Sequence, residues 1–351
     1  MISVFGRIKE GGKVAASLIG TVIGAGFVSG AELIRFFPTQ NFLPYAVLAA
    51  AAFCAVFFLL FHCGKKFGGF DGVLQFAFGR AANAVRYIIL SCSLVTCASM
   101  LAGADSAVRE GFGLQYSVPV LALAFSAVTY LLSGRGMRAV CGVNLLLVPI
   151  IFCFLMRFAS GADFIGVAYY PAAGTAVKVF RVVLYVGMNA LLSAPVVCDL
   201  GNNYPSGGIG CSAAALCIGF CAAVVLGCIA KEGAGAFGSE MPFLYAVGSA
   251  AVGRVFVCVS LCGIFTTLFS SYYPLFSFAA EKKSPRIWRL LFLAAAFSLS
   301  LCGLRSLVNT VYPFLGAAGL VLTVACVRAY FVRVFSRRCA VFEKKSKPFS
   351  S

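Results

Sequence analysis

Charged residues are scarce in this chain of 351 residues. They make up 11% of it, against roughly 25% in an average soluble domain, and only 11 residues are acidic. Hydrophobic residues reach 61%, and no polar stretch is long enough to form a soluble domain. This composition predicts a polytopic membrane protein with a single membrane domain, and it excludes a separate soluble catalytic module.

Motifs of catalysis and of metal binding are also missing. The sequence has no HExxH, no GxSxG and one histidine, and its 16 cysteines stand singly with no CxxC pair. The net charge of +17 has to be counted by side of the membrane, so it does not indicate a nucleic acid partner. We therefore expect no enzyme, no resident cofactor, no nucleic acid and no obligate protein partner.

The apolar runs predict an all-α protein of about ten transmembrane helices. The last two expected helices are separated by a tight loop at Gly303 and Arg305, and a short surface helix is expected at 241–248. The expected spans are 13–37, 42–62, 81–106, 117–133, 139–158, 176–198, 208–230, 251–279, 287–304 and 306–334.

The distribution of basic residues predicts the orientation in the membrane. With the N-terminus in the cytoplasm, 20 of the 28 basic residues fall on the cytoplasmic side. The other eight are Arg35, Arg109, Arg157, Lys178, Arg181, Lys231, Arg254 and Arg305. This asymmetry favours ten spans with both termini cytoplasmic, so that residues 1–338 form the membrane domain and 339–351 a basic cytoplasmic tail.

Glycine is concentrated in the first expected span, "SLIGTVIGAGFVSGAELIRFF", at positions 20, 24, 26 and 30. Each glycine weakens a helix by about 1 kcal/mol relative to alanine. Gly20 with Gly24 and Gly26 with Gly30 form small-xxx-small pairs, which would allow close packing against another helix. The alternative is a helix that unwinds in the membrane.

A second segment favours the unwound interpretation. "LYVGMNALLSAPVVCDLG", residues 184–201, places Gly187, Asn189 and Pro195 within the sixth expected span, about half a chain after Gly24. Interrupted helices at corresponding places in two halves are typical of inverted-repeat secondary transporters. The expected repeats are about 13–158 and 176–334. Unwound backbone would offer carbonyls to a cation and amides to a carboxylate.

"GTVIGAGFVSGAELIRFF" resembles the first helix of the YkvI-like family of bacterial membrane proteins, a branch of the amino acid/polyamine/organocation superfamily with the LeuT fold. "YVGMNALLSAP", "SEMPFLYAV", "IFTTLFSSYYPL" and "VYPFLGAAGL" are similar to later blocks, so the resemblance covers nearly the whole chain. One departure is Ala31, which stands where a polar residue is expected before Glu32.

The resemblance implies a LeuT-like 5+5 inverted repeat with helices one and six interrupted. It also implies symport of a small solute, most simply an amino acid or related zwitterion, with sodium favoured over protons as the coupling ion. The alternative is a channel or a membrane sensor. A channel should show a repeated polar stripe or a selectivity loop, whereas this sequence shows two single breaks.

The same resemblance implies the site residues. Sodium would bind the carbonyls of Gly20 and Ile23 and the hydroxyls of Thr266 and Thr267, although those hydroxyls could instead bond to their own helix. The substrate site would comprise Gly24, Ala25, Gly26, Gly187, Asn189 and Ser193.

Glu32 and Asp105 are the acidic residues expected at membrane depth, where a charged carboxylate costs about 3 kcal/mol or more. Glu32 lies one turn before Arg35, so this pair predicts either an external gating salt bridge or a role in proton coupling. Asp105, four residues before Arg109, is expected in solvent at the outer end. His62 is expected at the level of the lipid headgroups.

Reporter fusions test the orientation. A fusion after Lys283 and a fusion after Lys347 should both report a cytoplasmic location, because the charge asymmetry places both segments inside. A periplasmic signal from either fusion would contradict the ten-span arrangement.

Overall fold

Helices dominate the computed structural model, which describes residues 4–113, 119–166, 174–237, 241–247, 250–302 and 314–332. The helices are α1 Val4–Val22, α2 Ala25–Ser29, α3 Ala31–Phe36, α4 Leu43–Phe67, α5 Phe70–Phe78, η1 Gly79–Ala81, α6 Ala82–Phe112, α7 Val120–Ser133, α8 Met137–Ala159, α9 Thr175–Asn203, α10 Ile209–Glu232, α11 Ala234–Phe237, α12 Pro242–Val247, α13 Ala250–Ala280, α14 Pro285–Ser300 and the C-terminal helix Phe314–Val332. In the described part of the chain, the β-structure is an isolated bridge between Gln40 and Gly166.

Seven of the described helical stretches are long and apolar enough to cross a membrane: α4, Phe70–Arg109, α8, α9, α10, α13 and the C-terminal helix. The other three expected spans correspond to the broken α1–α3, to the 14-residue α7 and to the 16-residue α14. The all-helical class is therefore confirmed, and the count of ten and the 5+5 repeat stay predictions. The expected loop at Gly303 and Arg305, residues 306–313 and the tail 339–351 lie outside the described residues.

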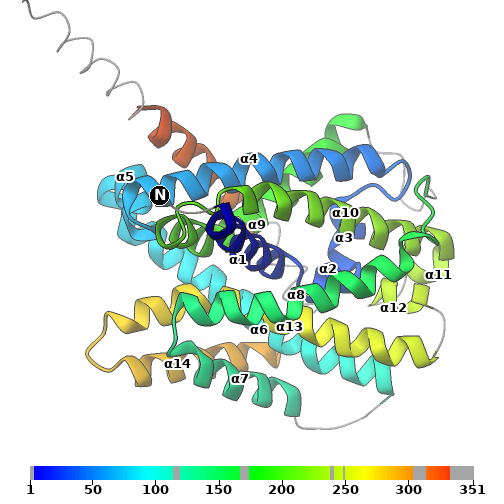
Figure 1. The fold of residues 1–351 in the computed structure, drawn as a ribbon. Coiled ribbons are helices and arrows are strands. Elements are labelled where there is room, and N and C mark those ends of the chain that lie inside the picture. The colour runs from blue at the N-terminus through cyan, green and yellow to red at the C-terminus, as the bar shows by residue number, and fades with distance from the viewer. Residues whose placement is uncertain are drawn as a thin grey trace, which may run out of the picture.

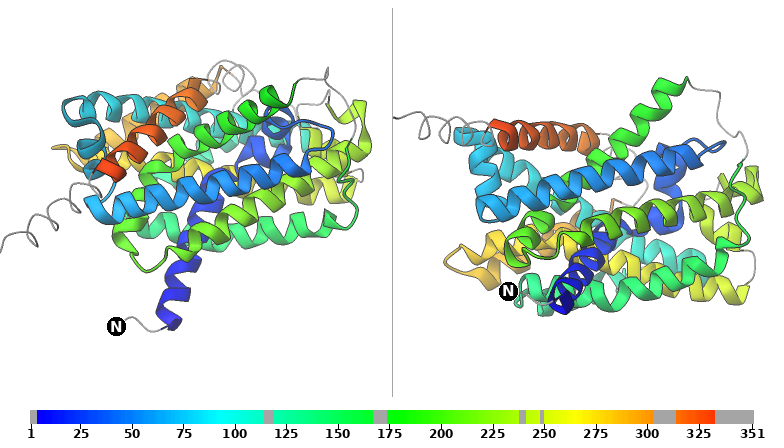
Figure 2. Two further views of the ribbon diagram at one scale, coloured as in Figure 1. Left: turned by 90° about the horizontal axis from the view of Figure 1, so that it is seen from above. Right: turned by 45° about the horizontal axis from the view of Figure 1, so that its top comes forward.

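The long helices form two groups with α1 between them (Figure 1). One group contains α4, α9 and α10, and the other contains α6, α8, α13 and α14. Helix α1 contacts α8, α10 and α13, while its N-terminal end projects from the bundle (Figure 2). The break between α1 and α2 consequently lies inside the molecule, where neighbouring helices surround it.

Helix α12 confirms the short surface helix expected at 241–248, because Tyr245 on one side of it is exposed. The Phe243 side chain is fully buried, and its ring packs edge-on against those of Phe158 and Phe256 at 5.7 and 5.2 Å between centroids. Burial of this ring anchors the segment to α8 and α13. Residue 248 lies outside the described chain.

Helix α9 corrects the expectation that the sixth helix is interrupted, because it runs unbroken from Thr175 to Asn203 with Pro195 inside it. Gly187 faces the C-terminal helix: a β-carbon added there would lie 2.8 Å from the Gly316 carbonyl oxygen, and one added at Gly319 would overlap the Gly187 carbonyl. The glycine thus serves close helix packing. Neighbouring helices can accommodate a proline inside a membrane helix without unwinding it.

The same kind of packing joins α4 to α9. A β-carbon at Gly64 would overlap the backbone of Cys198, and one at Gly201 would overlap the Phe61 carbonyl. The two helix backbones touch at these points.

The close approach of α4 and α9 predicts the effect of adding a side chain at Gly64. Gly64→Ala should lower the free energy of unfolding by about 1–3 kcal/mol, because backbone atoms have to move to admit the methyl group. Gly142→Ala in α8 is the matched control, since no heavy atom lies within 4 Å of the added β-carbon. Thermal unfolding of the purified proteins in detergent measures both. Equal unfolding temperatures for the two variants would contradict the close approach of α4 and α9.

Candidate cation and substrate site

The first helix is interrupted as expected. Helix α1 ends at Val22, and the single turn of α2 begins at Ala25 after a bend at residues 23 and 24. A second break follows at Gly30, whose φ of +83° lies in the left-handed region that favours glycine. The polypeptide therefore changes direction twice between α1 and α3, and backbone groups at the breaks leave the helical hydrogen-bond pattern.

Oxygen atoms from α1 and α13 converge at the first break. The Thr267 hydroxyl donates a hydrogen bond to the Gly20 carbonyl at 2.9 Å, and the Thr266 hydroxyl donates to the Gly263 carbonyl at 2.9 Å. Two glycines permit this approach of the helices. A β-carbon added at Gly24 would lie 2.7 Å from the Thr267 hydroxyl oxygen, and one added at Gly263 would lie 3.1 Å from the Ile23 carbonyl oxygen. The structure thus brings Gly20, Ile23 and Thr267 together, whereas the Thr266 hydroxyl bonds to a carbonyl of its own helix.

This cluster suits a monovalent cation. The side chain of Thr266 is 0% exposed and that of Thr267 is 5% exposed, so water has little access. The oxygens are neutral carbonyls and hydroxyls, and the C-terminal end of α1 contributes partial negative charge. Carbonyls of an interrupted helix are the ligands that sodium takes in transporters of this architecture. The sequence interpretation missed Gly263, although its position one turn before Thr266 was a usable signal.

Glu32 lies at the second break. It is 6% exposed, and a β-carbon added at Gly26 would overlap its carboxylate. The carboxylate of α3 therefore folds back onto α2, beside the backbone of residues 24–26. The expected place of Glu32 and Arg35 near the outer end of the helix stays a prediction. External gating with Arg35 and proton coupling both stay predictions.

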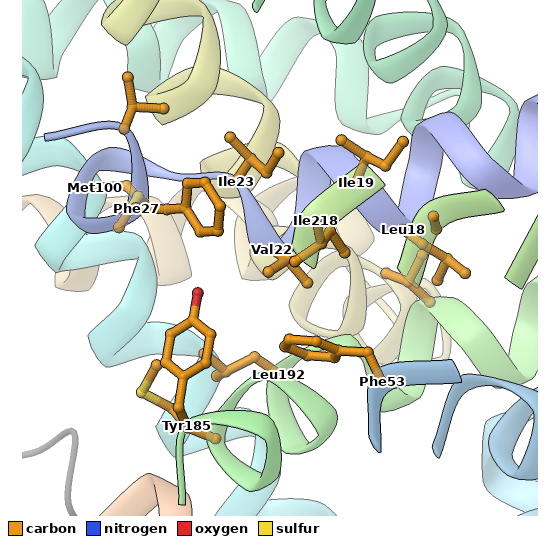
Figure 3. Packing of buried hydrophobic residues seen from close by; sticks show 14 of the residues in the cluster. Leu18, Ile19, Val22, Ile23, Phe27, Phe53, Met100, Tyr185, Leu192 and Ile218 are labelled. Atoms are coloured by element: carbon orange, nitrogen blue, oxygen red, sulfur yellow. The ribbon is translucent and has the colours of Figure 1, made fainter. Parts of the chain in front are cut away.

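Apolar side chains surround the first break (Figure 3). Tyr185 of α9 is fully buried, and its hydroxyl points toward the α1–α2 break, with Phe27 and Leu192 nearby. Sequence reasoning missed Tyr185. The available signal was its position one helical turn before Asn189, which places both residues on one face of α9.

The polar residues expected from the sixth helix bond within α9. The Asn189 amide donates to the Tyr185 carbonyl at 3.0 Å, and the Ser193 hydroxyl donates to the Ala190 carbonyl at 3.4 Å. Asn189 shares the Tyr185 face, whereas Gly187 faces the C-terminal helix. Asn189 thus lies on the face of α9 that carries Tyr185, and Gly187 does not.

Asp105 corrects another expectation. It is 6% exposed rather than solvated, and its carboxylate accepts hydrogen bonds from the backbone amides of Leu121 and Ala122 at 3.3 and 3.4 Å. These amides belong to the first turn of α7, where partners from outside the helix are needed. Asp105 thus holds α6 to α7, which is a structural role. The exposed His62 ring bonds the Phe58 carbonyl, and its place at the headgroups stays a prediction.

Sequence reasoning also missed the carboxylate of Asp199, which lies near the C-terminal end of α9, beside the start of α5. Asp199 accepts hydrogen bonds from the Tyr273 hydroxyl at 2.6 Å and from the Phe70 backbone amide at 2.7 Å. One side chain therefore joins α9, α13 and α5. The contact spans 129 residues in sequence, so no local pattern indicates it.

No family model matches the chain. Over 149 residues it is 25% identical to the membrane protein YkvI of Bacillus subtilis (strain 168), and the aligned stretch covers 41% of this chain and 42% of that protein. The resemblance to YkvI is thus confirmed, although the match spans less than half the length of that relative.

Solved structures share the fold over most of the chain. Mhp1, a nucleobase-cation-symport-1 family transporter in a closed conformation with bromovinylhydantoin bound, matches with a TM-score of 0.58 and 15% identity, covering 88% of this chain and 76% of Mhp1. Inward-facing Mhp1 matches with a TM-score of 0.60 and 16% identity, and the match covers 91% of this chain and 76% of Mhp1. A Na+-coupled sialic acid symporter matches with a TM-score of 0.57 and 11% identity, and the match covers 92% of this chain and 79% of the symporter. The chain is a multi-pass membrane protein with the LeuT-type fold of these symporters.

The contact between Gly26 and Glu32 predicts an energetic coupling. Gly26→Ala should destabilise the protein, because its β-carbon overlaps the carboxylate, and Glu32→Ala should relieve that overlap. We expect a coupling of about 0.5–3 kcal/mol between the two substitutions. Thermal unfolding of the wild type, both single variants and the double variant measures it. Additive effects would mean that the carboxylate does not lie against α2.

Proposed function

We propose that this protein is a secondary active transporter that moves a small organic solute, an amino acid or a related zwitterion, together with a cation. The observation that supports this proposal most directly is the hydrogen bond from the Thr267 hydroxyl of α13 to the Gly20 carbonyl near the interrupted end of α1, where the Ile23 carbonyl also faces Gly263 of α13. The symporters that share the fold support the same class of function. Residues 1–338 would form one transport domain in a bacterial cell membrane, with both termini cytoplasmic.

Sodium is the coupling ion that these ligands favour. A neutral set of oxygens binds a cation without needing a group that titrates, and hard cations prefer oxygen ligands. Gly20, Ile23, Thr266 and Thr267 would supply them. Proton coupling would require a titratable group near the substrate, for which Glu32 is the candidate at the break.

The proposed substrate site lies between the broken segment and α9. The backbone of Gly24, Ala25 and Gly26 would bind the polar end of the solute, and Asn189 and Ser193 would complete the site from α9. Phe27 and Tyr185 beside the break suit an apolar side chain of the solute (Figure 3). Gly187 has no direct place in this proposal, because it packs against Gly316.

The Glu32 carboxylate adds a charged group to the proposed substrate site, because it lies against Gly26. It offers a negatively charged partner to the ammonium group of an amino acid, and a zwitterion would then span the break with each end near groups of opposite polarity. The alternative function, a channel, is less favoured because the polar backbone is exposed at a buried helix interruption rather than in a repeated polar stripe or a selectivity loop.

Uptake into proteoliposomes tests the proposal. A thermal-shift screen of amino acids with and without sodium first selects the solute, because a ligand that binds the folded state raises the unfolding temperature. An inward sodium gradient should then drive its uptake. Thr267→Ala should weaken this sodium dependence about tenfold, because the variant loses one ion ligand. Glu32→Gln should weaken binding of the solute, because it removes the charged partner of the ammonium group, but it should leave the sodium concentration for half-maximal uptake largely unchanged.

Two outcomes would contradict the assignment. Uptake driven by a pH gradient without sodium, abolished by Glu32→Gln and indifferent to Thr267→Ala, would make the protein a proton symporter. Conduction that does not saturate with solute concentration and shows no counter-transport would replace the carrier with a channel.

A further inference from the structure

A buried amide on α8 lies beside the cation cluster but outside the residues considered so far. Asn144 is 0% exposed. Its amide nitrogen donates to the Val140 carbonyl at 2.8 Å and to the Ser270 hydroxyl oxygen at 3.1 Å. Both hydrogens of the amide are therefore used, and this fixes which end of the group carries the oxygen.

The oxygen end of this amide lies against α1. A β-carbon added at Gly20 would overlap Oδ1 of Asn144, so the absence of a side chain at Gly20 makes room for this oxygen. Gly20 is also the residue whose carbonyl accepts the Thr267 hydroxyl. The amide of α8 and the hydroxyl of α13 thus approach the same residue of α1.

Oδ1 of Asn144 has no hydrogen-bond partner among the described residues. An amide oxygen can only accept, and buried acceptors without a partner are rare in native proteins. The buried Thr129 hydroxyl also lacks a partner, but a hydroxyl can rotate its hydrogen toward another acceptor. The Thr267 hydroxyl cannot supply the missing hydrogen, since it donates to Gly20.

We propose that Asn144 provides an amide oxygen from α8 to the cation bound between α1 and α13, which makes it a three-helix site. The inference rests on the proposed cation coupling and adds a ligand residue to it. Oδ1 of Asn144 and the Thr267 hydroxyl, which both approach Gly20, would then reach the ion together with the Gly20 carbonyl, and Ser270 holds the amide in place. A leucine of similar size would fill the same volume without an oxygen.

Sodium binding to the purified protein in detergent tests this role without a substrate. The measurement is the sodium concentration that gives half of the maximal thermal stabilisation, with choline chloride keeping the ionic strength constant. Asn144→Leu should raise this concentration about tenfold or more, because it removes an ion ligand. Asn144→Asp should lower it or leave it unchanged, because a carboxylate oxygen adds negative charge to the site.

Thr129→Val is the matched control, because it also removes a buried polar atom without a partner, on α7, which supplies none of the residues proposed for the cation site. It should leave the sodium concentration unchanged. If the wild type responds to sodium and Asn144→Leu responds at the same concentration, Asn144 is not a ligand, and the proposed function stands. If the wild type shows no response to sodium, lithium or potassium, the cation coupling itself is wrong. Should Asn144→Leu fail to fold, Asn144→Asp decides: weaker sodium binding overturns the inference.

Discussion

The hydrogen bond from the Thr267 hydroxyl to the Gly20 carbonyl joins α13 to α1 where α1 stops being helical. A broken helix inside a membrane exposes backbone groups, and each one without a partner costs several kcal/mol. The break is therefore stable only where another helix supplies those partners. Helix α13 does so because Gly24 and Gly263 let the two backbones approach. The proposed cation site is a consequence of this requirement, since oxygens gathered to stabilise the break can also bind an ion.

Glycine explains why the predicted interruption was confirmed in the first helix and wrong in the sixth. In the first helix, four glycines accompany real breaks, and Gly30 adopts a conformation that other residues rarely take. In the sixth helix, Gly187 looked equivalent, but it faces Gly316 and allows close packing within a continuous helix. Sequence spacing cannot separate the two uses, because unwinding and close packing require the same missing side chain. Only the position of the neighbouring helix distinguishes them.

The pairing of distant polar groups was the other part that sequence could not predict. Composition and hydrophobic runs were sufficient for an all-helical membrane protein, and Thr267 does lie against Gly20, whereas Thr266 bonds within its own helix. By contrast, Asp105 is 16 residues from its partner Leu121, and Asn144 is 126 residues from Ser270. Such contacts depend on how helices assemble. A buried polar residue in an apolar run indicates that a partner exists, but it does not identify the partner.

Asp199 has a mechanical consequence. Its two carboxylate oxygens bind groups on two different elements, the Tyr273 hydroxyl and the amide at the start of α5. Because both bonds end on one short side chain, α5 and α13 are tied to the same point of α9 while the bonds persist. Each bond uses its own carboxylate oxygen, so either can break without the other. A movement of α5 or of α13 against α9 therefore has to break one hydrogen bond, while the other still restrains its own element.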